Sequence, residues 1–128
     1  MDQDKYQQMQ VLDYQTKQLH KIIENIDAQL LEMSNTSSAL KDFEKLKNND
    51  EILFPVANGI FAKGKLTDNH LLRINIGSDV VVEKSVKDTI TMMETQAKEI
   101  ENYKTEVMSQ LQKFMDKMNE LQEEWEAV

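Results

Sequence analysis

Two long hydrophobic repeats, one toward each end of the 128-residue chain, most constrain what this sequence can fold into. In residues 9–40, apolar side chains recur at alternating intervals of three and four residues, which is the spacing of a coiled-coil seam. Eight of the ten seam positions are apolar, and the exceptions are Thr16 and Ser37. The apolar seam residues are Met9, Leu12, Leu19, Ile23, Ile26, Leu30, Met33 and Leu40.

The second repeat is more regular and runs from residue 86 to residue 128. Twelve of its thirteen seam positions are apolar, and only Lys104 departs from the pattern, with Tyr103 beside it to cover the gap. Ser85 followed by Asp88 resembles a helix capping box, and Asn48-Asn49-Asp50 indicates a helix stop. The sequence therefore predicts helices over residues 4–48 and 85–128.

Neither helix is expected to stand alone, because each exposes a long apolar stripe. The connection between them is short, so the simplest arrangement folds the second helix back along the first. If residue 48 lies near residue 86, paired residue numbers sum to about 134. This register places Leu19 against Phe114 and Ile23 against Leu111, and it fills the seam sensibly.

The middle of the chain, residues 52–83, has a different pattern. It contains β-branched residues in alternation, all three glycines and the one proline. Asn58-Gly59 is the strongest hairpin signal in the sequence, and Gly77-Ser78-Asp79 supplies a second turn. The expected fold is α+β but mainly α, a single domain over 1–128 in which a long antiparallel two-helix coiled coil carries two β-hairpins. The strands are expected near Leu53–Ala57, Ile60–Leu66, Leu71–Ile76 and Val80–Glu83.

The four short strands are expected to serve as an assembly platform. A sheet of this size cannot bury its own apolar residues, and its free edges can pair with other strands. The partner expected for them is the same region of other subunits. The residues predicted to form this platform are Leu53, Val56, Ile60, Phe61, Leu66, Leu72, Ile74, Ile76, Val80, Val81 and Val82.

The free ends of the two helices are predicted to bind partner proteins. Apolar residues there lie partly off the seam, and a two-helix structure has no further layer to cover them, so they form an exposed patch. Methionine adapts its shape to varied partners, although seam methionines also simply fill a coiled coil. The predicted binding residues at these tips are Tyr6, Met9, Val11, Leu12, Met115, Met118, Leu121, Trp125 and Val128.

Composition and charge argue against several other functions. The net charge is −8, and residues 86–128 contribute −5 through 5 Lys and 10 acidic residues, so nucleic-acid binding is not expected. The absence of cysteine excludes disulfides and thiolate metal sites. His20 and His70 lie far apart in the proposed register, and the carboxylates follow solvated helix faces, so no catalytic, metal or cofactor site is predicted. The polar first ten residues and the lack of a long apolar run predict neither a signal peptide nor a membrane span.

One motif resembles the start of a phosphate-binding loop. Residues 59–65 read Gly-Ile-Phe-Ala-Lys-Gly-Lys, which fits the pattern G-x-x-x-x-G-K. That loop needs Ser or Thr next and a helix after it, whereas here Leu66 and a strand pattern follow. A nucleotide-binding or enzyme-accessory role is therefore a weak alternative, and we expect a protein that is not an enzyme.

Three segments of the middle region resemble the alpha-class subunit of prefoldin. Ile52-Leu53-Phe54-Pro55-Val56 resembles the family's V-L-V-P-L strand entry, and Phe61 to Leu66 resembles its Y-V-x-G-K-I/L strand. Residues 76–85, Ile-Gly-Ser-Asp-Val-Val-Val-Glu-Lys-Ser, resemble its L-G-T-G-Y-Y-V-E-K-S segment. Asp79 replaces a usual glycine, but aspartate tolerates positive φ better than most residues, so the turn is expected to survive.

This resemblance implies an ATP-independent chaperone subunit in the cytoplasm. It further implies a hexamer of two alpha and four beta subunits, in which hairpins build central barrels and the coil tips hold unfolded or nascent proteins. Those client proteins would pass to a group II chaperonin. The alternative that remains is a coiled-coil adaptor or scaffold subunit with the same fold in a complex that is not a chaperone.

Overall fold

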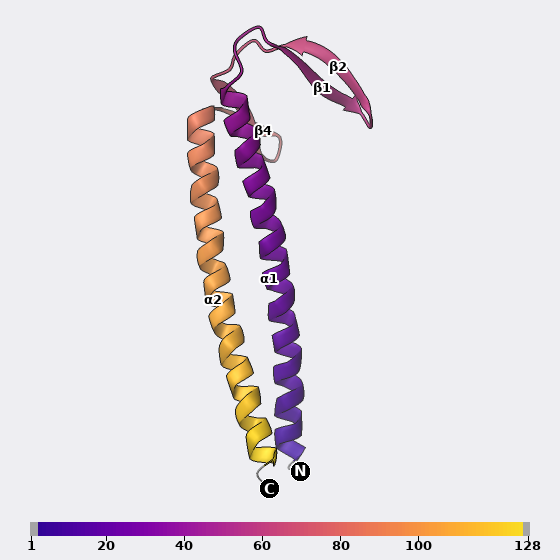
Figure 1. Cartoon of the computed structure of the whole chain (residues 1–128), viewed down its shortest axis with the longest axis vertical. Coiled ribbons are helices and arrows are strands. Elements are labelled where there is room, and N and C mark those ends of the chain that lie inside the picture. The colour runs from indigo at the N-terminus through magenta and orange to yellow at the C-terminus, as the bar shows by residue number, and fades with distance from the viewer. Residues whose placement is uncertain (1–2, 127–128) are drawn as a thin grey trace. The chain divides into compact units, whose positions relative to one another are not determined.

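The structure of the chain, a computed structural model that describes residues 3–126, contains two long helices with two β-hairpins between them (Figure 1). Helix α1 spans Gln3–Glu44 and helix α2 spans Val86–Glu126. The predicted fold class, mainly helical with two hairpins, is confirmed. The strands are β1 (Glu51–Ala57), β2 (Ile60–Lys65), β3 (Leu71–Gly77) and β4 (Val80–Ser85).

The described residues group into two compact units, which we treat separately. The coil unit consists of residues 3–32 and 97–126, and the hairpin unit consists of residues 33–96. The coil unit therefore contains most of both helices. The hairpin unit contains all four strands together with the end of α1 and the start of α2. The single domain over residues 1–128 stays a prediction.

The coil unit is held together by an apolar core between antiparallel stretches of α1 and α2. Leu19, Ile26 and Val107 are buried at its centre. The members of both predicted neighbour pairs belong to this cluster, because Leu19 is part of its buried centre and Ile23, Leu111 and Phe114 pack against it. Other partly buried members are Ile22, Leu30 and Ile100.

The axial register inside the coil unit agrees with the predicted one. The Thr16 hydroxyl lies 3.6 Å from the Met118 sulfur, and these two seam positions are partners when residue numbers sum to 134. The seam residue Lys104 directs its ammonium to the Asp27 carboxylate at 2.6 Å. Tyr103 does not cover this position, since its side chain is exposed. The lysine itself fills the gap, because its aliphatic stem can lie along the seam while its charged end reaches an anion.

Helix α1 ends at Glu44 rather than at residue 48, so the predicted boundary is wrong by four residues. The reason is a turn in which the Lys47 N–H donates to the Asp50 carboxylate at 2.8 Å, and Asn49 takes a left-handed φ of 73°. The backbone of this turn also bonds to the end of the first hairpin. The Asn49 N–H donates to the Leu66 carbonyl at 2.6 Å, and the Leu66 N–H donates to the Asp50 carbonyl at 2.9 Å.

Helix α2 begins directly after β4, as the capping signal predicts. The Ser85 hydroxyl accepts a hydrogen bond from the Asp88 N–H at 3.0 Å, which satisfies one of the free donors of the first helical turn. Strand β4 is longer than predicted, because Ser85 still pairs with Leu71 of β3. The same residue therefore ends a strand and caps a helix, which leaves no loop between them.

The two hairpins form separate two-stranded antiparallel sheets, β1 with β2 and β3 with β4. Both predicted turns are present. In the first, Gly59 has a φ of 73°, and the register shifts so that Val56 is an extra residue on β1. In the second, Ser78 and Asp79 have φ values of 51° and 62°. Positive φ at both central residues is typical of a type I′ turn, so aspartate does support the turn where the family usually has glycine.

Candidate functional site

The hairpins expose a large set of apolar side chains, which we call the hairpin surface. Leu53 is 63% exposed and Val56 is 66% exposed, values that are high for residues of this type in a strand. The other exposed members of the predicted platform are Ile60, Phe61, Ile76, Val80 and Val81. Sequence reasoning omitted Phe54 and Leu71, which are exposed as well.

Four other residues of the predicted platform are less accessible. Leu72, Ile74 and Val82 are partly buried and share one face of the β3–β4 hairpin, because Ile74 pairs with Val82 and Leu72 lies two residues before it. Leu66 is buried and lies beyond the end of β2, where its backbone bonds to the turn after α1. The backbone hydrogen bonds of Leu66 therefore attach the end of the first hairpin to the turn that follows α1.

The β1–β2 hairpin is apolar on both of its faces. Strand alternation places Ile52 and Phe54 on one face, and Leu53 with Phe61 on the other. Strands that are apolar on both faces are typical of sheets covered on both sides. In the isolated chain, neither Leu53 nor Phe61 is covered.

Gly64 lets the Phe54 ring lie across the neighbouring strand. A Cβ atom at Gly64 would lie 2.8 Å from Cε1 of Phe54, closer than side-chain atoms approach one another. This glycine is the second one of the G-x-x-x-x-G-K motif, and it lies within β2 rather than before a helix. The motif therefore has the structure of a turn and a strand, not the helix N-terminus that phosphate binding requires.

The end of the coil unit carries the second apolar surface, which we call the coil-end surface. It is defined by the exposed residues Tyr6, Val11, Met115 and Trp125. Trp125 is 46% exposed even though it occupies a seam position. The salt bridge of 3.0 Å between Lys5 and Glu124 brings the start of α1 to the end of α2, but both side chains are exposed, so it adds little stability.

The other residues predicted at the tips lie deeper in the coil. Met9, Leu12 and Met118 are partly buried, and Leu121 is buried at 5% exposure. Leu121 therefore packs between the helices and is not accessible at the surface of the isolated chain. Val128 lies outside the described residues.

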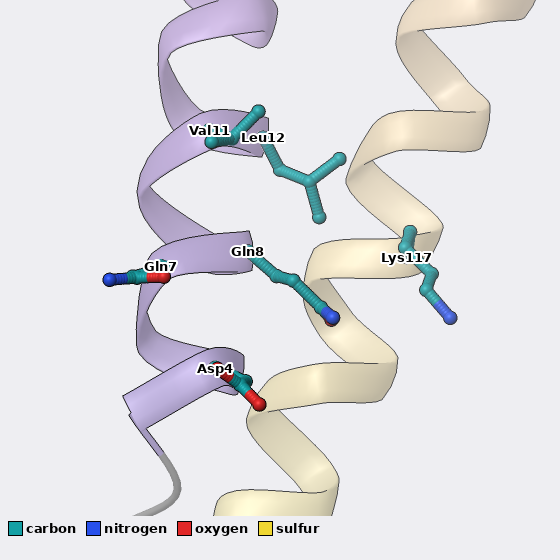
Figure 2. Close-up of a pocket in the computed structure, with 6 residues that line it drawn as sticks. All are labelled: Asp4, Gln7, Gln8, Val11, Leu12 and Lys117. Carbon is teal, nitrogen blue, oxygen red and sulfur yellow. The ribbon is translucent and has the colours of Figure 1, made fainter.

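Two grooves adjoin the coil-end surface. The larger one, about 540 Å³, is lined by both helices, and Figure 2 shows Gln8 and Leu12 directed toward α2 while Gln7 points the other way. A second groove of about 380 Å³ lies beside Met9 and Trp125. The lining of the larger groove combines two amides and two apolar side chains with one acidic and one basic residue, a mixture that suits contact with a polypeptide. The larger groove is lined by Asp4, Gln7, Gln8, Val11, Leu12 and Lys117.

Other exposed apolar residues of the helices were missed by the seam pattern. Tyr14, Leu31 and Met108 occupy outward or flanking heptad positions and are exposed. The signal that could have identified them is an apolar residue outside the seam, because the 4-3 repeat considers only the seam positions. Because they are scattered singly along the helices, they do not form a third surface.

The described residues contain neither a metal centre nor a membrane span. No group of three or more His, Asp or Glu residues within residues 3–126 is arranged to hold a metal ion. In the same part of the chain, neither helix has a stretch that is apolar enough over sufficient length to span a bilayer. His20 and His70 are both exposed.

One carboxyl in the linker between the hairpins has a perturbed pKa. The Asp68 carboxylate accepts hydrogen bonds from the N–H groups of His70 at 2.7 Å and Leu71 at 3.3 Å. These bonds favour the charged form and lower the pKa of Asp68, with the His70 N–H as the larger cause. The bonded turn fixes where β3 begins, so its role is structural.

Comparison with known proteins adds a family to this geometry. The family model described as "Prefoldin subunit" matches residues 12–128. The chain belongs to the prefoldin family. Curated relatives carry the name prefoldin subunit alpha. The protein from Methanococcus vannielii is 27% identical over 124 residues, covering 97% of this chain and 83% of that protein. The protein from Archaeoglobus fulgidus is 26% identical over 125 residues, covering 98% of this chain and 91% of that protein.

A solved structure shares the fold of this prefoldin subunit. A chain of filamentous PFD from Methanocaldococcus jannaschii, determined by cryo-EM, superposes with a TM-score of 0.81 at 16% sequence identity. The match covers 93% of this chain and 98% of that one. The predicted resemblance to the alpha class is confirmed by the names of the relatives, and the predicted fold is confirmed by this structure. Prefoldin is a chaperone family whose subunits form hetero-oligomeric complexes.

Proposed function

We propose that this prefoldin subunit is an ATP-independent chaperone subunit of the cytoplasm that is not an enzyme. Its hairpin surface assembles with beta-class subunits into a hexamer of two alpha and four beta subunits. Its coil-end surface, together with those of the other subunits, captures unfolded or nascent proteins and delivers them to a group II chaperonin. The two units of the chain act together as a single domain.

One observation carries this proposal: the exposed apolar residues gather at two surfaces of different chemistry. The hairpin surface combines free strand edges with aliphatic residues, which suits pairing with other strands. The coil-end surface offers Tyr6, Met115 and Trp125 on helices without a further layer, which suits loose contact with varied apolar segments.

A single coil end is small, and it binds weakly by itself. Several coil ends on one platform act together, so the avidity of the complex exceeds the affinity of one end by roughly 10²–10⁴. Folded proteins expose too little apolar surface to engage several ends, whereas unfolded chains engage them all. Selectivity for non-native proteins thus follows from geometry, and release follows when the client folds or is handed over.

The assembly step is tested by breaking the strands. Ile74→Pro with Val81→Pro removes backbone donors from the β3–β4 hairpin, and native mass spectrometry with the co-expressed beta subunit is expected to show free subunits. Leu31→Ser is the control, because it changes an exposed apolar residue outside the hairpins, and it should leave the hexamer intact. A hexamer that survives both proline substitutions would refute assembly through this hairpin.

The capture step is tested on the assembled complex with a denatured client. Tyr6→Ser, Met115→Ser and Trp125→Ser combined should weaken suppression of aggregation while the hexamer remains intact, and removal of residues 1–10 and 119–128 should weaken it further. Leu31→Ser is the control, because Leu31 is also apolar and exposed and lies in the coil unit but outside the coil-end surface. Unchanged protection by the triple variant would favour the adaptor role over the chaperone role.

A further inference from the structure

The seam of α2 contains one charged residue, and its single anionic partner lies on the other helix. Lys104 occupies a seam position between Ile100 and Val107, and its side chain is 30% exposed. Its ammonium contacts the Asp27 carboxylate at 2.6 Å, the only ion pair of the described residues that joins a seam lysine to the middle of the opposite helix. An apolar residue would fill this position with more favourable burial, so lysine is retained at some loss of stability.

The pattern of α1 makes this pair sensitive to sliding. The residues one heptad away from Asp27 are His20 on one side and Ser34 on the other. If α2 slid along α1 by one heptad in either direction, Lys104 would face an imidazole or a hydroxyl instead of a carboxylate. The apolar residues would still meet apolar residues, because a heptad shift superposes one seam position on another. The hydrophobic seam alone therefore favours the native register only slightly over the two slipped registers. The ion pair favours it more clearly, because only the native register places a carboxylate opposite Lys104.

We propose that the Lys104–Asp27 pair fixes the axial register of α2 against α1 in the coil unit. A one-heptad slip would displace the helices by about 10 Å. That displacement would separate Tyr6 and Val11 of α1 from Met115 and Trp125 of α2. The pair thus positions the two halves of the coil-end surface, although it lies several turns away from them.

The register can be read by disulfide trapping, because the natural chain has no cysteine. Thr16→Cys with Met118→Cys reports the native register, since these side chains are in contact. Met9→Cys with Met118→Cys reports a one-heptad slip, because residue 9 lies seven positions before residue 16. Intrachain disulfides are distinguished from interchain ones by mobility on a non-reducing gel.

Each reporter pair is combined with changes at the ion pair in the full-length chain. In the parent chain the native reporter should cross-link and the slip reporter should remain at background. Lys104→Leu should raise cross-linking of the slip reporter by up to about fivefold, the equilibrium effect of an ion pair at the upper end of the usual range. Thermal unfolding of this variant should be unchanged or occur at higher temperature, because the seam becomes fully apolar. Asp27→Lys with Lys104→Asp should return the slip reporter to background.

The control is Lys17→Leu, which removes a lysine whose ion pair with Asp13 lies within α1. It should leave both reporters unchanged. Slip cross-linking that stays at background in Lys104→Leu would overturn the proposal, because the seam and the hairpins would then fix the register without the pair. A swapped pair that cross-links as Lys104→Leu does would also overturn it, since the ionic contact would not be what matters.

Discussion

The coil unit and the hairpin unit use the same kinds of apolar residue with opposite results. Ile26 and Val107 of the coil unit are each 5% exposed, whereas Leu53 and Val56 of the hairpin unit are more than half exposed. Two amphipathic helices cover one another's stripes, so the coil unit buries its seam within one chain. A two-stranded sheet has no second layer of its own, so its apolar residues remain exposed to water in the isolated chain. The coil unit is thus stabilised from within, whereas the hairpin unit leaves these apolar residues exposed in the isolated chain.

The largest effect is expected from a substitution that leaves a cavity in the core of the coil unit, and it tests whether this unit is stabilised by its own seam. Ile26→Ala should lower the free energy of unfolding by about 2–5 kcal/mol, because a buried side chain is replaced by a cavity. Urea unfolding followed by far-UV circular dichroism measures this change. Leu31→Ala is the control five residues away, and it should change the free energy by less than about 0.5 kcal/mol because Leu31 is 64% exposed. Equal effects of the two changes would contradict the packing of α1 against α2.

In the hairpin unit, the corresponding test uses the two glycines of the β1–β2 hairpin. The cost of replacing them is expected to depend on local backbone and ring geometry rather than on burial. Gly59→Ala should destabilise the hairpin by about 1–2 kcal/mol, since φ is 73° there and no atom lies within 4 Å to obstruct a side chain. Gly64→Ala should cost about 1 kcal/mol through contact with Phe54, whose half-exposed ring can move aside.

The two causes separate in a Phe54→Leu background. The cost of Gly64→Ala should fall there, because the ring that obstructs the Cβ is gone, whereas the cost of Gly59→Ala should not change. Hydrogen exchange of the β1 and β2 amides reports both. An equal fall for the two glycines would mean that the phenylalanine stabilises the whole hairpin rather than occupying the space above Gly64.

The joint between β4 and α2 tests how firmly the hairpins are attached to the helix. Ser85→Ala removes the acceptor for the Asp88 N–H and should destabilise the first turn of α2 by about 1 kcal/mol. Ser85→Thr keeps a hydroxyl at the cap and should recover most of this loss. Amide exchange at residues 86–89 is the measurement, and unaltered exchange in Ser85→Ala would show that the strand pairing alone holds the joint.

The smallest effect is expected at Asp68 and depends on pH. Its pKa is lowered from the ordinary value of 3.8, so its contribution to stability is fully present above that value and is lost as pH falls through the lowered folded pKa. Asp68→Asn should remove this dependence below pH 3.8, and near neutrality it should lower stability slightly, because the neutral amide oxygen accepts the same N–H bonds less strongly than the carboxylate does. A carboxyl titration by NMR should place the Asp68 midpoint below 3.8, and a midpoint at or above it would contradict the turn.

The regular elements were predictable because each has a local signal. The 4-3 repeat placed α1 and α2, and the seam at Leu19, Ile26 and Val107 is buried as predicted. Asn58-Gly59 and Gly77-Ser78-Asp79 placed the hairpin turns. The end of α1 was not predictable from the repeat, because it depends on hydrogen bonds between the turn at Asn49 and Leu66, which are far apart in the sequence.

The candidate surfaces were predictable as regions, but their members were not. Leu66 and Leu121 were expected at interfaces, yet both are buried within the chain. Tyr14 and Leu31 were not singled out, yet both are exposed. Whether an apolar residue faces solvent depends on which neighbours cover it. The sequence pattern indicates the face of the helix or strand on which the residue lies, but not what packs against that face.

The sequence by itself determined the period of each element, and with it the two-helix coil, the two hairpins and the family. A heptad repeat and an alternating strand are local properties, so any chain with these spacings presents the same stripes and faces. Only the tertiary structure decided that Lys104 meets Asp27, that Phe54 lies over Gly64 and that Trp125 stays exposed at a seam position. The two contacts join residues from different elements, and the exposure of Trp125 depends on which side chains of the other helix reach it. All three are therefore set by packing rather than by spacing along the chain.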